Sequence, residues 1–142
     1  MTEIKTIEGV VVTPLAFHHD RRGFLAELFR RDELAERQFP EMAYMSETLP
    51  GVSRGPHEHR DQTDLFCFPG PGDMTLYLWD VRENSPTKGA KLKMLVGESN
   101  PCRVIRSARC HSRLQEYLVQ KYPGCRCTES FVRREKPGMS RR

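Results

Sequence analysis

The sequence predicts an all-β domain, either a sandwich or a small barrel, from three features of residues 1–105. Short apolar runs recur at intervals of roughly 8–12 residues, the spacing typical of such folds. Turns containing glycine and proline, such as PGPG at 69–72, separate the runs. Helical character is confined to one short segment, 32–38 (DELAERQ), where Asp32 is a candidate cap.

The expected strands follow one another along the chain at 10–12, 24–29, 42–48, 65–68, 74–81, 91–96 and 103–105. The segment 74–81, MTLYLWDV, has the clearest pattern. Because side chains alternate along a strand, Leu76 and Leu78 are expected on one face and Trp79 on the other. Cys67, between two phenylalanines, is expected to be a buried, unreactive thiol.

Length and composition limit the class of protein. The 142 residues fit one domain with one modest core. No apolar run approaches the roughly 20 residues that a membrane-spanning helix needs. The first residues, MTEIKTIEG, lack a signal-peptide pattern. We therefore expect a soluble cytoplasmic protein without a membrane partner, whose five cysteines are free thiols.

Positive charge gathers toward the end of the chain. Residues 106–142 contain ten Lys/Arg and three Asp/Glu, a formal charge of +7, whereas residues 1–105 carry −3. A basic tail can indicate nucleic-acid binding. These charges lack interleaved aromatic residues and any known motif, so no nucleic-acid partner is expected.

The segment 50–59, PGVSRGPHEH, is the strongest candidate for a functional site. His57 and His59 are one residue apart, so on a strand both side chains would share a face. Arg54 lies three residues upstream. Two histidines beside an arginine indicate either a metal site or a proton-transfer site for an anionic substrate. The alternative is a solvated polar turn that happens to contain histidines.

Three ordered segments resemble the dTDP-4-dehydrorhamnose 3,5-epimerase family. They are DRRGFLAELFR (20–30), GVSRGPHEH (51–59) and YLWDVRENSPTKG (77–89). The resemblance covers roughly residues 8–105 and implies a cupin-type jelly roll, also called a double-stranded β-helix. It also implies a cytoplasmic isomerase of dTDP-rhamnose and polysaccharide biosynthesis, and a homodimer formed by strand exchange.

The resemblance assigns roles to four residues. His57 would be the general base that removes a proton beside the C4 keto group of a dTDP-4-keto-sugar. Arg22 and Glu27 would contact the nucleotide-sugar, and Arg54 would bind its diphosphate. No cofactor is needed, because the keto group already acidifies the neighbouring C–H bond.

The sequence departs from the family pattern near these residues. Asp64 stands where the family usually has a lysine, and an acid cannot stabilise an enolate as an ammonium group does. Met42 and Tyr44 fall where the family has a substrate-binding Gln-x-Asn. The substrate or the reaction is therefore open at this stage.

Two alternative functions follow from these departures. His57, His59 and Asp64 resemble the first metal motif of cupins, which would give an enzyme dependent on a divalent metal such as Zn, Fe, Mn or Ni. The other alternative is a non-catalytic sugar-nucleotide binder.

The tail supports a division into a cupin-like domain, 1–105, and a basic tail, 106–142, that is not native sequence. Residues 106–121, RSARCHSRLQEYLVQK, can be back-translated with permitted codons. With the first base dropped they read VPPGVIHAYKNISSK, which resembles the family's Pro-Pro-Gly-x-x-His-x-Tyr-x-Asn segment. We therefore hypothesise a frameshift at about residue 106. The closing strands of the jelly roll would then be missing or disrupted.

Overall fold

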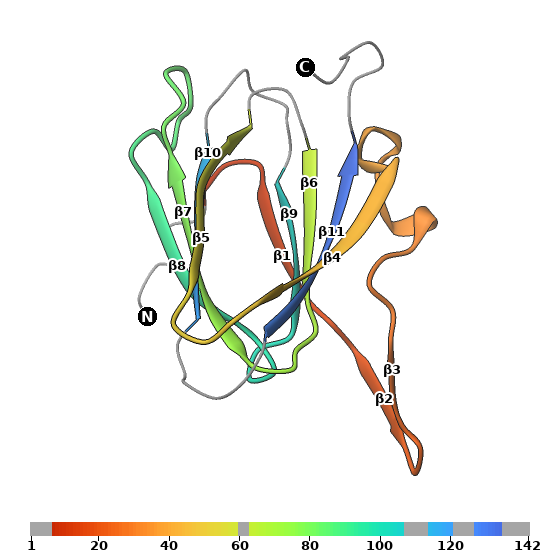
Figure 1. Cartoon of the computed structure of the whole chain (residues 1–142). Helices are drawn as coiled ribbons and strands as arrows, with labels where there is room; N and C mark the ends of the chain where they lie inside the picture. Colours follow the sequence, from red (N-terminus) through yellow and green to blue (C-terminus); the bar gives the residue numbers. More distant parts are fainter. Residues whose placement is uncertain (1–6, 60–62, 107–113, 121–126, 135–142) are drawn as a thin grey trace, which may run out of the picture.

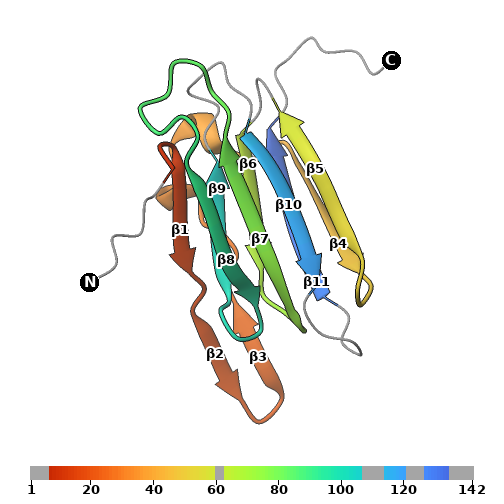
Figure 2. The same cartoon turned by 90° about the vertical axis from the view of Figure 1, so that its left-hand side faces the viewer.

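Two antiparallel sheets packed face to face make up the body of the protein (Figures 1 and 2). The structure is a computed structural model that describes residues 7–59, 63–106, 114–120 and 127–134. For residues 37, 57–59, 114–120 and 127–134 it describes the backbone alone. The two-layer arrangement confirms the predicted all-β class.

The strands of each sheet come from distant parts of the chain. The five-stranded sheet has the order β1 (Val10–Pro14), β9 (Cys102–Arg106), β6 (Thr63–Phe68), β11 (Cys127–Arg134), β4 (Met42–Thr48). The four-stranded sheet has the order β5 (Ser53–His59), β10 (Leu114–Gln120), β7 (Asp73–Asp80), β8 (Lys91–Gly97). β4 and β5, which are consecutive along the chain, therefore lie at the edges of different sheets.

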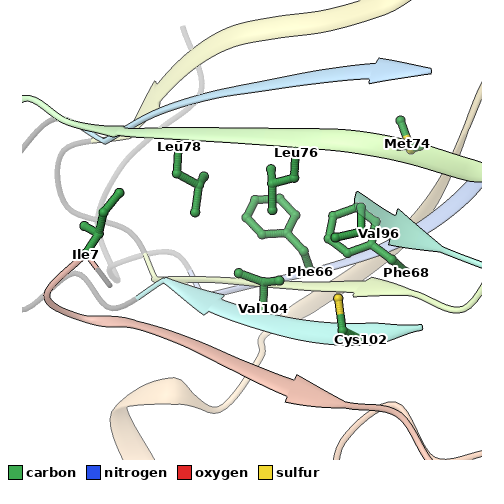
Figure 3. Packing of buried hydrophobic residues seen from close by; sticks show 9 residues of the cluster. All are labelled: Ile7, Phe66, Phe68, Met74, Leu76, Leu78, Val96, Cys102 and Val104. Carbon is green, nitrogen blue, oxygen red and sulfur yellow. The ribbon is translucent and has the colours of Figure 1, made fainter. Parts of the chain in front are cut away.

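Apolar side chains from both sheets meet between them and form the main core (Figure 3). β7 supplies Met74, Leu76 and Leu78, each 1% exposed, whereas its alternate residues Tyr77 and Trp79 are only half-buried. The predicted alternation along 74–81 is therefore confirmed. Burial of one such leucine contributes about 1.5–3 kcal/mol relative to an exposed one. The other members of the cluster are Ile7, Phe66, Phe68, Val96, Cys102 and Val104.

A second, smaller cluster covers the outer face of the five-stranded sheet. Leu34, from the connection after β3, packs against Leu65, Cys67 and Ile105. Cys67 is fully buried and has no disulfide, and burial raises the pKa of its thiol to about 12. The expectation of a buried, unreactive thiol at this position is confirmed.

The helical segment expected at 32–38 is replaced by two separate 3₁₀ turns, η1 (Arg31–Glu33) and η2 (Glu36–Gln38). Asp32 lies inside the first turn and is not its cap. Leu34, between the turns, has extended backbone angles and is 7% exposed. Burial of the Leu34 side chain in the smaller cluster stabilises the extended conformation more than the weak helical preference of the segment stabilises a helix. Neither turn is long or apolar enough to cross a bilayer, and no other helix occurs in the described segments.

A hairpin stands apart from both sheets. Among the described strands, β2 (Phe17–Asp20) pairs only with β3 (Gly23–Ala26), and Figure 1 shows the hairpin projecting beyond the body of the protein. The sequence predicted a single longer strand at 24–29. The observed strand ends at residue 26, and its partner strand was not predicted.

Two backbone segments of the basic tail occupy interior positions in the sheets. β10 pairs with β5 and β7, and β11 pairs with β4 and β6. The sequence predicted missing or disrupted closing strands, whereas the backbone provides strands at both places. The side chains of these strands lie outside the described part, so the division at 105/106 stays a prediction.

Candidate functional site

A tight turn carries the chain from β4 in one sheet to β5 in the other. The Val52 N–H donates to the Leu49 carbonyl at 3.2 Å, which closes a four-residue turn. Pro50 and Gly51 occupy its central positions, and Gly51 has a φ of 74°. Proline followed by a glycine of positive φ is the signature of a type II turn. The turn sets Arg54, near the start of β5, beside the end of β4.

Arg54 is held by two hydrogen bonds to β4. Its Nε donates to Thr48 Oγ1 at 2.6 Å, and its Nη2 donates to the Glu47 carbonyl at 2.6 Å. Thr48 is 1% exposed, whereas Arg54 is exposed. The exposed Arg54 guanidinium can therefore contact an anion in solvent while its Nε is bound to the buried Thr48. This suits the diphosphate-binding role expected of Arg54.

The two histidines of the motif both lie on β5, as the argument for a shared face requires. In the strand register His57 opposes Glu116, which opposes Leu78. His59 opposes Leu114, which opposes Asp80. The side chains of Leu78 and Asp80 are buried, and Leu78 belongs to the core between the sheets. The backbone register therefore aligns positions 57 and 59 with positions of β7 whose side chains are buried, and the histidine side chains lie outside the described part.

Arg22 and Glu27 lie at the projecting hairpin, far along the fold from Arg54. The Arg22 side chain is 83% exposed and binds Asp20 Oδ2 through its Nη2 at 2.6 Å. Glu27 has a side chain that is 58% exposed and lies 3.8 Å from Arg30 Nη1. Figures 1 and 2 show the hairpin on the side of the molecule away from the β4–β5 turn. A single chain therefore does not bring these two residues to Arg54.

Asp64 forms a buried ion pair on the inner face of the five-stranded sheet. Its Oδ2 accepts a hydrogen bond from Nη2 of Arg106, the residue opposite it on β9. Asp64 is 5% exposed and Arg106 4%. Where the family lysine would place a positive charge, this chain has an acid bound to a guanidinium.

The metal alternative receives no support from the described residues. The Asp64 carboxylate binds Arg106. No group of three potential ligands occurs among the side chains that the structure describes. The side chains of His57 and His59 lie outside the described part.

A hydrogen-bonded network, which sequence reasoning missed, lies at the end of β7. The Asp80 carboxylate accepts bonds from Arg82 Nε at 2.7 Å, Ser85 Oγ at 2.6 Å and Thr87 Oγ1 at 2.6 Å. Burial alone would raise the pKa of Asp80, but these hydrogen bonds lower it well below its usual range. Arg82 also donates to the Glu8 carbonyl at 2.6 Å, which ties the chain before β1 to this end of the sandwich. The spacing Asp-x-Arg-x-x-Ser-x-Thr in residues 80–87 is the sequence feature that could have predicted this network.

Comparison with known sequences places these residues within a family. A family model described as dTDP-4-dehydrorhamnose 3,5-epimerase matches residues 4–110. The spore coat polysaccharide biosynthesis protein SpsL of Bacillus subtilis is 43% identical over 99 residues. The probable low-salt glycan biosynthesis epimerase Agl13 of Haloferax volcanii is 43% identical over 101 residues. Each match covers 70% of this chain, and the chain spans 64% of the length of these relatives.

Solved structures confirm the fold. The dTDP sugar isomerase of Desulfovibrio desulfuricans superposes with a TM-score of 0.78 at 23% identity, over 93% of this chain and 82% of that chain. A 3'-monoepimerase of Streptomyces bikiniensis, ChmJ, in complex with dTDP-quinovose, has a TM-score of 0.74 at 20% identity, over 90% and 65% of the two chains. The jelly-roll architecture expected from the three sequence segments is therefore correct.

Proposed function

We propose that this chain, which belongs to the dTDP-4-dehydrorhamnose 3,5-epimerase family, epimerises a nucleotide-linked 4-keto-6-deoxy sugar. The observation that carries the proposal is the family match over residues 4–110, which contains His57 and Arg54 on one strand. Both curated relatives are named for polysaccharide or glycan biosynthesis, and we propose the same use for the product.

The proposed reaction is a proton exchange at a carbon beside the C4 keto group. Neutral His57 accepts the proton, and the electrons of the broken C–H bond form an enolate. A proton from solvent is then delivered to the same carbon from the opposite face, which inverts the centre and restores the ketone, and His57 releases its own proton to solvent. The keto group supplies the acidity, so the step consumes no oxidant, reductant or cofactor. The backbone register, which aligns position 57 with the position of the buried Leu78, supports this role for His57.

Arg54 is proposed to bind the diphosphate of the substrate. A planar guanidinium matches phosphate oxygens, and the bonds to Thr48 and Glu47 leave the group at an exposed position on the corner between the sheets. His57 follows three residues later on the same strand. The strand would thus keep a fixed distance between His57, which accepts the proton, and Arg54, which binds the diphosphate.

Arg22 and Glu27 are proposed to act on the site of a second copy of the chain. A two-stranded hairpin is only marginally stable by itself. This hairpin exposes Phe24 by 59% and Leu25 by 62%, an apolar surface suited to burial in a homodimer. The ring centroids of Phe17 and Phe24 are 4.7 Å apart, which stiffens the projecting element. Strand exchange would carry Arg22 and Glu27 to a partner's β5.

The proposed location is the cytoplasm. Cys67 and Cys102 are both buried free thiols, which fits a reducing compartment.

The proposed frameshift at about residue 106 is supported by where the family match ends, at residue 110. Sequencing the DNA around codon 106 tests it. A second reading frame that continues the family pattern is the expected result. A single clean frame, without shifted homology nearby, would refute the idea.

Deuterium uptake tests the function directly. In heavy water the chain should incorporate deuterium into a dTDP-4-keto-6-deoxy sugar, and His57→Ala should abolish the uptake. Lys91→Ala, at an exposed position of β8, is the control and should retain it. Binding of the sugar nucleotide without uptake would identify a binding protein. Stoichiometric metal that survives dialysis would favour the metal-dependent alternative.

A further inference from the structure

The contact between Thr48 and Arg54 joins a buried residue of one sheet to an exposed cation of the other. Thr48 ends β4 and is 1% exposed. Its hydroxyl oxygen accepts the Arg54 Nε–H at 2.6 Å. We infer that Thr48 is a positioning residue that orients Arg54 for the diphosphate and so sets the affinity for the nucleotide. This inference rests on the proposed function.

Two bonds on one edge of the guanidinium fix its direction. Nε binds Thr48, and Nη2 binds the neighbouring Glu47 carbonyl, also at 2.6 Å. A planar group held at two nitrogens has one orientation, so the directions of its other N–H groups are determined as well. An exposed arginine without such bonds would sample many rotamers and would lose that freedom on binding a phosphate. Orientation before binding removes this cost.

The chemistry of the threonine suits this role. A guanidinium only donates, so its partner must present an oxygen that accepts. The two substituents on Cβ of threonine restrict its side-chain rotamer, which holds the oxygen in place. The buried site keeps competing water away from the contact. Serine preserves the acceptor, whereas valine preserves the shape and removes the acceptor.

A purely structural role for Thr48 makes a different prediction. If the contact only tied β4 to β5, Thr48→Val would lower stability and leave the affinity of the folded protein unchanged. If Thr48 orients Arg54, substrate affinity changes and the chemical step does not. The dissociation constant for dTDP, and KM compared with kcat, separate the two roles.

The experiment compares Thr48→Val, Thr48→Ser and Arg54→Ala in the full chain. Thr48→Val should raise the dissociation constant for dTDP, measured by calorimetry, by about tenfold, which corresponds to about 1.4 kcal/mol. It should raise KM for the sugar nucleotide similarly and leave kcat unchanged. Thr48→Ser should restore both values. Thr75→Val, at another buried threonine on a different strand, is the control and should have no effect.

A double variant ties the effect to Arg54. In an Arg54→Ala background Thr48→Val should cause no further loss of affinity, because the group it orients is absent. An equal loss in both backgrounds would overturn the inference. So would unchanged dTDP affinity in folded Thr48→Val.

A ligand-free measurement separates this inference from the proposed function. The ¹⁵N spectrum should show the Arg54 Nε–H signal shifted in Thr48→Val and retained in Thr48→Ser. An unshifted signal in Thr48→Val refutes the positioning role whatever the enzyme does. Absence of deuterium uptake by the wild type, with dTDP binding that depends on Arg54 and Thr48, refutes only the epimerase proposal.

Discussion

The β4–β5 corner and the β2–β3 hairpin both carry residues expected to contact substrate, but the two regions differ in how firmly the rest of the chain holds those residues. At the corner, Arg54 is fixed by a tight turn and by a buried threonine. At the hairpin, Arg22 binds only its neighbour Asp20 among the contacts described, and its side chain is 83% exposed. The described contacts of Arg54 lie within one chain, whereas the hairpin is the part that we proposed a second chain completes.

Mixing inactive variants gives the largest expected effect and tests this contrast. If the chain forms the proposed homodimer, Arg22→Ala and His57→Ala should each be inactive when purified alone. Mixed in equal amounts, with subunit exchange, they should recover about a quarter of wild-type activity, because half of the dimers contain one intact site out of two. Deuterium uptake after mixing measures the recovery.

The matched control for that mixture uses the corner. Arg54→Ala mixed with His57→Ala should recover nothing, because Arg54 and His57 serve the same site from the same chain. Recovery in both mixtures, or in neither, would contradict the distinction between the two regions.

Asp80→Asn gives the next largest effect, on stability. The buried Asp80 carboxylate balances Arg82, so its loss leaves an uncompensated cation and should lower the free energy of unfolding by about 3–5 kcal/mol. Because folding lowers the pKa of Asp80, its stabilisation is present above about pH 4 and is lost as the pH falls below it. Urea denaturation at pH 7 and at pH 3 measures both effects.

Asp20→Asn is the comparison variant at the hairpin. Hydrogen bonds from the Arg22 side chain lower the pKa of Asp20 too, but the carboxylate is exposed to solvent. Screening by water makes its removal much less harmful to unfolding stability. A loss as large as that of Asp80→Asn would show that the hairpin is as firmly built as the body.

Phe24→Asp should weaken the proposed dimer without unfolding the subunit. A charge on this exposed apolar surface must lose water when the partner docks, so the dissociation constant of the dimer should rise by about tenfold or more. Sedimentation velocity over a concentration series measures it. Val11→Asp, an exposed apolar residue of β1, should leave the dimer as it is.

Gly51→Ala should have the smallest effect. No atom lies within 4 Å of the added Cβ, so the cost arises from the positive φ alone and should be about 1 kcal/mol. Thermal unfolding measures the loss, and Gly51→Asn should lose less because asparagine tolerates this conformation. A loss of several kcal/mol would indicate that the turn cannot relax without displacing Arg54.

Local periodicity predicted the parts of the fold that depend on a single strand. The alternation at Leu76, Trp79 and Leu78 is a property of neighbouring residues, so it could be read directly. The extended conformation at Leu34 could not be predicted in this way, because it results from packing against Leu65 and Ile105, which lie on strands far along the chain. Tertiary packing determined that segment.

The same limit applies to the candidate site. The spacing of His57 and His59 predicted that the two would share a face if their segment formed a strand, and the segment does form one. The hydrogen bond from Arg54 to Thr48 depends on how two sheets meet, which no pattern along one strand reports. The ion pair of Asp64 with Arg106 also joins two different strands, so no pattern along one strand predicts it. Whether the His57 side chain points inward stays a prediction.

The Arg54 side chain bridges an edge strand of each layer, and this has a consequence for motion. Any fluctuation that separates β4 from β5 must also displace the guanidinium from Thr48. A nucleotide bound to the guanidinium would therefore oppose the separation of β4 from β5. Amide hydrogens along both edges should exchange more slowly in its presence, at residues that never touch it.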